Sequence, residues 1–204
     1  MAALDTPARR VRSRVARFGC SYDAWAMTHR MGIDRAFVEG WAEYQRLLLE
    51  AIGPLTAEQL SSRTAPFQWA VWQLAAHMAS SRAYWFHDVL GEGDAAVREM
   101  FRVDSTTVPG LPLEDADWED DERHPRTASE LVEAFDRTWA MMDACLGRWS
   151  AEDLVVEFPR SRRSGEVRTV TRGWVVWHLI EHDLHHGGEI SQILGSNGIL
   201  APEL

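Results

Sequence analysis

Hydrophobic side chains recur every three or four residues in four long stretches of the chain, the spacing that places them on one face of an α-helix. The first two stretches are residues 34–52 and 69–90. The other two are residues 127–147 and 170–194. The pattern therefore predicts four long amphipathic helices.

Local signals mark the ends of these helices. Gly53-Pro54 ends the first helix, and residues 56–59 follow with the Thr-x-x-Gln pattern of a capping box, which predicts a short helix. Residues 127–130 carry a second capping box, with Glu in the last position, at the start of the third helix. Glycines end the second and fourth helices: Gly91, Gly93, Gly195 and Gly198.

The connection between the second and third helices, residues 103–126, contains three prolines and an acid-rich run at 114–122. Such a segment is typical of a long irregular crossover. Neighbouring carboxylates repel one another and favour water, so we interpret the run as solvated surface rather than as a metal site. Four helices with one long crossover predict an all-α four-helix bundle, a fold that often builds metal sites between facing helices.

Composition is consistent with one globular domain. The 204 residues are 46% hydrophobic and 25% charged, and no stretch approaches the roughly 18 apolar residues of a spanning helix. The first 31 residues differ, because their six arginines and two aspartates give a local charge of +4. We expect a disordered basic extension at 1–31, with Met27 and Met31 as alternative starts and a targeting arm as the other interpretation, before a domain at 32–204.

Charge and cysteine content narrow the function classes. A net charge of -10 opposes binding to a phosphate backbone, so we expect no nucleic-acid partner. Cys20 and Cys145 are too far apart in sequence for a metal or redox pair, which favours a cytoplasmic protein with free thiols and Cys145 facing the core. Large rings in helices usually fill the core, and we expect this of Trp41, Trp69, Trp72, Trp85, Trp139, Trp174 and Trp177.

Four of the eight histidines fall within nine positions, at 178, 182, 185 and 186. Residues four apart on a helix share a face, so His182 could bind one metal ion together with His186 or with His178. All three cannot do so, because His178 and His186 are about 12 Å apart along a straight helix. His185 points about 100° away from His186 and is expected at the surface.

Two imidazoles leave a divalent ion too open for tight binding, so a third ligand is needed. His77 is the natural candidate, since it lies mid-helix in an apolar stretch beside the small Ser80 and Ser81. A lone histidine of this kind is more often a hydrogen-bonded core residue, but the cluster on the fourth helix favours a ligand. Three histidines with an open position are typical of a catalytic site, and zinc, nickel, iron and manganese all accept imidazole.

Two segments resemble the DinB-like metal-dependent proteins, which include bacterial thiol S-transferases and relatives of mycothiol-dependent maleylpyruvate isomerase. They are Trp-Gln-Leu-Ala-Ala-His at 72–77 and Trp-His-Leu-Ile-Glu-His-Asp-Leu-His-His-Gly-Gly-Glu-Ile at 177–190, and the resemblance spans 34–194. The family pattern has His, three residues, His and then commonly Arg-Gly-Gln, where this chain has Gly-Gly-Glu at 187–189.

This alignment selects His182 and His186, together with His77, as the metal ligands. The resemblance implies a DinB/YfiT-like four-helix bundle, often a homodimer, that holds one divalent metal ion. Zinc or nickel is the first expectation, with iron or manganese next.

The resemblance favours an enzyme that transfers a low-molecular-weight thiol to an electrophilic small-molecule substrate. An external thiol is expected because no cysteine is near the histidines in sequence. One alternative is metal-dependent hydrolysis with Glu181, Asp183 or Glu189 as the base, although these carboxylates, and His178, could instead orient the histidines or face solvent. The other alternative is a metal- or ligand-binding stress protein without turnover.

Overall fold

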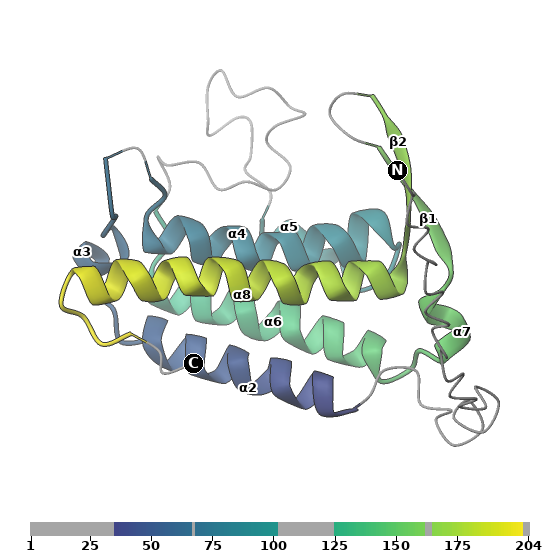
Figure 1. The fold of residues 1–204 in the computed structure, drawn as a ribbon, viewed down its shortest axis with the longest axis horizontal. Coiled ribbons are helices and arrows are strands. Elements are labelled where there is room, and N and C mark those ends of the chain that lie inside the picture. The colour runs from purple at the N-terminus through teal and green to yellow at the C-terminus, as the bar shows by residue number, and fades with distance from the viewer. Residues whose placement is uncertain (1–34, 67, 102–124, 162–164, 202–204) are drawn as a thin grey trace, which may run out of the picture. The chain divides into compact units, whose positions relative to one another are not determined.

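The computed structural model describes residues 35–66, 68–101, 125–161 and 165–201. The predictions for residues 1–31, for Cys20 and for the acidic run at 114–122 lie outside these residues. The described part contains the four long helices expected from the hydrophobic pattern (Figure 1): α2 (Arg35–Ile52), α4 (Val71–Ala83), α6 (Ala128–Leu146) and α8 (Arg172–Ser196). Helix α4 packs against both α8 and α6, and α6 also packs against α2.

Both predicted capping boxes are present. The Thr56 hydroxyl accepts a hydrogen bond from the Gln59 backbone N–H, and the Gln59 side chain accepts one from the Thr56 N–H at 2.9 Å, which starts α3 (Ala57–Leu60). Thr127 and Glu130 form the same reciprocal pair at the start of α6. These bonds satisfy N–H groups that the first helical turn would otherwise leave without a partner.

The second predicted helix differs from expectation in its last part. The α-helical hydrogen bonding of α4 ends at Ala83, and the chain continues as a π-helical segment, η1 (Tyr84–Val89). Gly91 then adopts a positive φ of 65°, which ends the helix as its sequence position predicted. A short helix that the sequence analysis missed, α5 (Ala95–Glu99), follows with Asp94 as its cap.

The fold is mostly helical, as predicted, and it also contains one short β-hairpin that the hydrophobic pattern did not predict. After the short α7 (Ala151–Leu154), strand β1 (Glu157–Ser161) pairs antiparallel with β2 (Val167–Thr171). Strand β2 runs directly into α8, whose first turn is capped by the Thr171 hydroxyl accepting from the Trp174 N–H. The fourth long helix therefore begins at Arg172, and not at the predicted position 170.

One buried cation connects all four long helices. Arg82 of α4 is fully buried, and its Nη2 donates to Asp183 of α8 at 2.6 Å. Its Nη1 donates to Gln45 of α2, and its Cζ lies 4.8 Å from the centre of the Phe135 ring of α6. A buried charge is costly unless it is paired, so this arrangement constrains how α8 is placed against α4.

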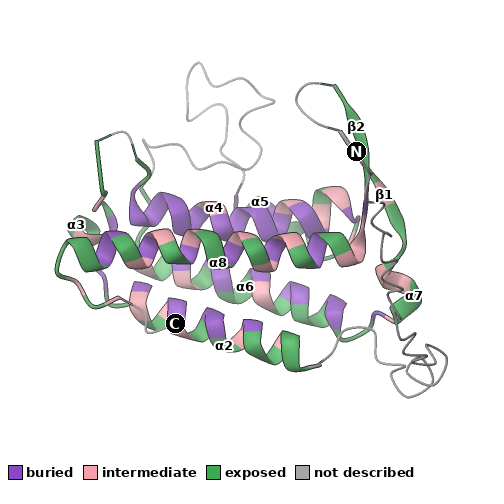
Figure 2. Cartoon of the chain, viewed as in Figure 1, coloured by how far each residue is buried: buried purple, intermediate pink, exposed green. Residues whose placement is uncertain are grey.

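The tryptophan prediction is right for some rings and wrong for others. Trp41, Trp72 and Trp85 are buried and Trp139 is partly buried, as expected, whereas Trp69, Trp174 and Trp177 are 40%, 41% and 62% exposed. Figure 2 shows the contrast between α4, which is almost entirely buried, and α8, whose faces alternate. Cys145 faces the core as predicted. Among the described helices, none is both long and apolar enough to cross a membrane.

Candidate metal centre

Helices α4 and α8 bring three of the predicted histidines together. His182 and His186 lie one turn apart on α8 with their ring centres 4.5 Å apart. The His77 ring of α4 lies 4.8 Å from that of His182 and 5.1 Å from that of His186. One ring nitrogen from each of the three lies within 4.8 Å of the others, so the cluster could hold a metal ion.

The burial of α4 singles out His77. Every residue of α4 is buried except His77, which is half-buried. Its ring therefore lies where the core opens toward solvent, and Trp69, just before α4, covers it with a ring-centre distance of 4.9 Å. His77 is thus the one residue of α4 that is not fully buried, and it lies beside His182 and His186 of α8.

The spacing of the nitrogen atoms matches the size of a divalent ion. Nε2 of His77 lies 3.0 Å from Nε2 of His182. Two imidazole nitrogens bound to one tetrahedral zinc ion would lie about 3.3 Å apart, because each Zn–N bond is about 2.0–2.1 Å. A shift of a few tenths of an ångström would open the pair to that distance, so these residues fit such an ion.

A carboxylate fixes the third histidine. Nδ1 of His186 lies 2.6 Å from Oε2 of Glu189, one turn further along α8. A carboxylate accepts hydrogen bonds and does not donate them, so this contact places the imidazole proton on Nδ1 and leaves Nε2 as an electron-pair donor. Carboxylate–histidine pairs of this kind commonly orient metal-binding histidines.

Burial keeps two of the imidazoles neutral. Desolvation, together with the nearby His186, lowers the pKa of His77 to about 4. Desolvation also lowers the pKa of His182 to about 2, with further contributions from the neighbouring histidines and Arg82. Both rings are therefore uncharged at neutral pH, which is the protonation state that binds metals.

His178 and His185 lie outside the three-histidine cluster. The His178 ring stacks on Trp174 at 4.9 Å, and its Nδ1 is 3.6 Å from the exposed carboxylate of Glu181. Burial lowers the pKa of His178. The His185 side chain is 65% exposed, as its position on the helix predicted.

Asp183, one of the candidate bases, is turned away from the three histidines. Its side chain is fully buried, and its Oδ2 accepts from Arg82 and, at 2.7 Å, from Trp41 Nε1. Although Asp183 follows His182 directly, consecutive helical residues point about 100° apart, so this carboxylate is turned into the core. It therefore binds the buried arginine and is not a base at the histidines.

Tyr44 packs closely against α8 beside the cluster. Its hydroxyl donates to the Asp183 carbonyl oxygen at 3.0 Å, and a Cβ atom at Gly187 would overlap that hydroxyl. Burial, and then the charge of Asp183, raises the pKa of Tyr44 to about 12, so the phenol stays protonated and remains a donor. Gly187 is therefore required for the close approach of α2 to α8, one residue after His186.

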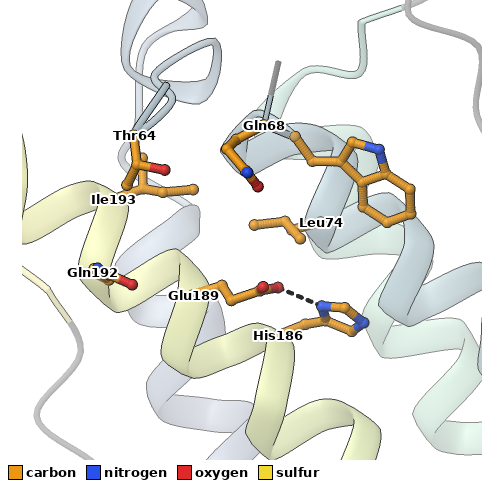
Figure 3. Close-up of a pocket in the computed structure, with 8 residues that line it drawn as sticks. Thr64, Gln68, Leu74, His186, Glu189, Gln192 and Ile193 are labelled. Atoms are coloured by element: carbon orange, nitrogen blue, oxygen red, sulfur yellow. Dashed lines mark hydrogen bonds and ion pairs between the residues drawn. The ribbon is translucent and has the colours of Figure 1, made fainter. Parts of the chain in front are cut away.

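A cavity of about 440 Å³ opens beside His186 (Figure 3). Besides His186 and Glu189, the residues that line it are Thr64, Gln68, Trp69, Leu74, Gln192 and Ile193. The polar residues Thr64, Gln68 and Gln192 were not predicted as part of the site. Gln192 could have been found, because it lies three residues after Glu189 and so shares a face of α8, but Thr64 and Gln68 come from the irregular segment before α4.

Comparisons with known proteins identify the fold. The chain is similar to the crystal structure of a DinB-like protein from Bacillus cereus ATCC 10987, with a TM-score of 0.58 and 18% identity over 85% of this chain and 99% of that one. It is also similar to a conserved protein from Enterococcus faecalis, with a TM-score of 0.59 and 18% identity over 81% and 99% of the two chains. No curated protein matches significantly.

A sequence model of the DinB superfamily matches residues 41–190 of this chain. The matched region contains His77, His182 and His186, and it is most of the chain's length. The chain belongs to the DinB superfamily.

Proposed function

We propose that His77, His182 and His186 hold one divalent metal ion and that the protein transfers a low-molecular-weight thiol to an electrophilic small molecule at this site. The observation that carries the proposal is the convergence of the three imidazoles beside an open cavity. A bound divalent cation lowers the pKa of a coordinated thiol and so supplies the reactive thiolate.

The residues around the cluster have distinct roles in this proposal. Glu189 orients His186 through the 2.6 Å contact with Nδ1. The cavity beside His186 receives the body of the thiol, with Leu74 and Ile193 as its apolar wall. The thiol proton goes to solvent, the sulfur electron pair forms a bond to the electrophilic carbon, and the leaving group departs with the electrons of the broken bond.

Zinc or nickel is the proposed ion. Three neutral imidazoles form a borderline donor set, and a thiolate as a further ligand favours the softer first-row metals. Iron or manganese would bind the same nitrogens, but manganese prefers oxygen donors and the proposed ligands are three nitrogens.

Two alternatives share the same site and differ in turnover. Hydrolysis needs a base near the metal, and of Glu181, Asp183 and Glu189 only Glu189 lines the cavity. Proton transfer to Glu189 would weaken the hydrogen bond by which it orients His186, so hydrolysis has less support than thiol transfer. A stress protein that binds metal without turnover would show the metal but no thiol-dependent reaction.

The metal content of purified protein tests the first half of the proposal. Wild type prepared without an affinity histidine tag should carry about one metal ion per chain by elemental analysis, and His77→Ala and His182→Ala should lose it. His185→Ala is the matched control on α8 and should keep the metal. Equal losses in His182→Ala and His185→Ala, or no metal in reconstituted wild type, would contradict the site.

Thiol-dependent turnover tests the second half. Zinc- or nickel-loaded wild type should accelerate conjugation of cysteine, cysteamine or glutathione to monobromobimane, and His182→Ala should reduce the rate to the uncatalysed one. Full metal occupancy with no rate above the uncatalysed one for any thiol would favour the non-catalytic alternative.

A further inference from the structure

The charge of the cavity beside His186 suggests what kind of molecule enters it. Among the described residues that line the cavity, Glu189 is the one aspartate or glutamate, and none is lysine or arginine. Gln68 and Gln192 contribute neutral amides. An anionic ligand would meet the Glu189 carboxylate there, and apart from the proposed metal ion no described lining residue would offset the repulsion.

The carboxylate of Glu189 retains acceptor capacity toward the cavity. Its Oε2 accepts from His186, and its Oε1 makes a longer ion-pair contact of 3.7 Å with Nε2 of the exposed His185. The Glu189 side chain is 41% exposed. Because a carboxylate has about four lone-pair positions, it can bind a further donor while it continues to orient His186.

Trp69 provides a second feature that favours a cation. The residue is 40% exposed, lines the same cavity and lies with its ring centre 6.4 Å from that of His186. The face of an indole ring attracts positive charge, so a ligand's ammonium group that lies over this face would gain attraction in addition to that of the carboxylate.

We propose that the cavity selects an aminothiol: Glu189 binds a protonated amine of the ligand while the ligand's sulfur reaches the histidine cluster. This inference rests on the proposed thiol-transfer function, and it names the substrate class. Cationic thiols are preferred over neutral ones, and anionic thiols bind most weakly. Figure 3 shows Glu189 directed from α8 into the cavity, next to His186.

Three small thiols that differ in charge test the proposal. Cysteamine carries an ammonium group where mercaptoethanol carries a hydroxyl and mercaptoacetate a carboxylate. Each is titrated into cobalt(II)-loaded wild type, and sulfur-to-cobalt charge-transfer absorption reports binding without any need for turnover. We expect cysteamine to bind roughly fivefold more tightly than mercaptoethanol, the effect of one solvent-accessible ion pair, and mercaptoacetate to bind most weakly.

Glu189→Gln separates the carboxylate from other causes. Glutamine can still accept from His186 Nδ1, and the variant is compared at saturating cobalt, where the preference for cysteamine should disappear and mercaptoacetate should gain affinity. Glu181→Gln is the matched control, because Glu181 lies on the same helix with a side chain 62% exposed and does not line the cavity. This control should leave all three affinities unchanged.

The outcomes distinguish failure of this inference from failure of the proposed function. A cysteamine preference that persists in Glu189→Gln would mean that its amine chelates the metal, and equal binding of all three thiols to wild type would remove the charge selection. Either result overturns the aminothiol inference while leaving thiol binding intact. If none of the thiols produces charge-transfer absorption, the proposed thiol chemistry fails, and the inference fails with it.

Discussion

At the scale of single residues, two adjacent glycines on α8 have opposite surroundings. Gly187 is buried against the Tyr44 hydroxyl, whereas Gly188 is exposed and has no atom near the position of a Cβ. Both immediately follow His186, and both lie within the Gly-Gly-Glu segment that departs from the family pattern. The pair offers a matched test of the packing of Tyr44 against α8.

We expect Gly187→Ala to lower the free energy of unfolding by about 1–3 kcal/mol, because the methyl group must displace Tyr44 or move α8. Gly188→Ala should instead raise it by roughly 0.5–1 kcal/mol through helix propensity. Urea unfolding of the metal-free proteins measures both values. A stabilisation of equal size in the two variants would show that Tyr44 does not pack against Gly187.

Residue spacing predicted part of the candidate site. The four-residue interval places His182 and His186 on one face of the helix, but it does the same for His178 and His182. The family resemblance was needed to select the first pair as metal ligands. The structure brings the first pair to His77 and stacks His178 on Trp174. Helical spacing predicts which residues share a face but not which other elements pack against that face. For this reason the contact of Asp183 with Arg82 could not be predicted, and Asp183 was included among the candidate bases.

At the scale of elements, α4 and α8 are joined by the Arg82–Asp183 pair as well as by the histidines. Arg82 lies five residues after His77, and Asp183 directly follows His182. The buried ion pair therefore limits sliding and rotation of α8 against α4 close to the cluster. Removing one charge would leave the other buried without compensation.

Asp183→Asn should therefore lower the free energy of unfolding by about 3–5 kcal/mol, because the buried guanidinium loses its counter-charge. Asp136→Asn, at an exposed position of α6, is the control and should change stability by less than about 0.5 kcal/mol. Chemical denaturation of both variants measures the difference. A near-neutral effect of Asp183→Asn would mean that water or another group compensates Arg82.

The long helices were predictable because each carries a sustained apolar period, and some have clear terminal signals, such as the capping box at Thr127 that starts α6. The hairpin was not predictable in the same way. Strand β1 is five residues long and contains Pro159 and charged residues, and its register depends on pairing with β2. The π-helical turn η1 was also missed, because six residues are too few to reveal a change of period.

At the scale of the whole molecule, the fold and the activity depend on different sets of residues. Solved structures only 18% identical share the fold, because many different apolar residues can fill the same helical faces. Activity depends instead on the few side chains at the cluster and its cavity. The candidate metal centre connects α4 and α8, so metal binding should be coupled to folding. The thermal stability of the whole domain can therefore report on the site.

Removal of the metal should therefore lower the stability of the entire domain. An ion that binds only the folded chain adds about 2.7 kcal/mol to the free energy of unfolding when its free concentration is one hundred times its dissociation constant. For a chain of this size, that increase corresponds to a Tm change of roughly 5–10 °C. We expect EDTA to lower the Tm of wild type by this order, excess zinc to restore it, and His77→Ala to show neither change. If EDTA lowered the Tm of wild type and His77→Ala equally, the ion would be bound outside the three-histidine cluster.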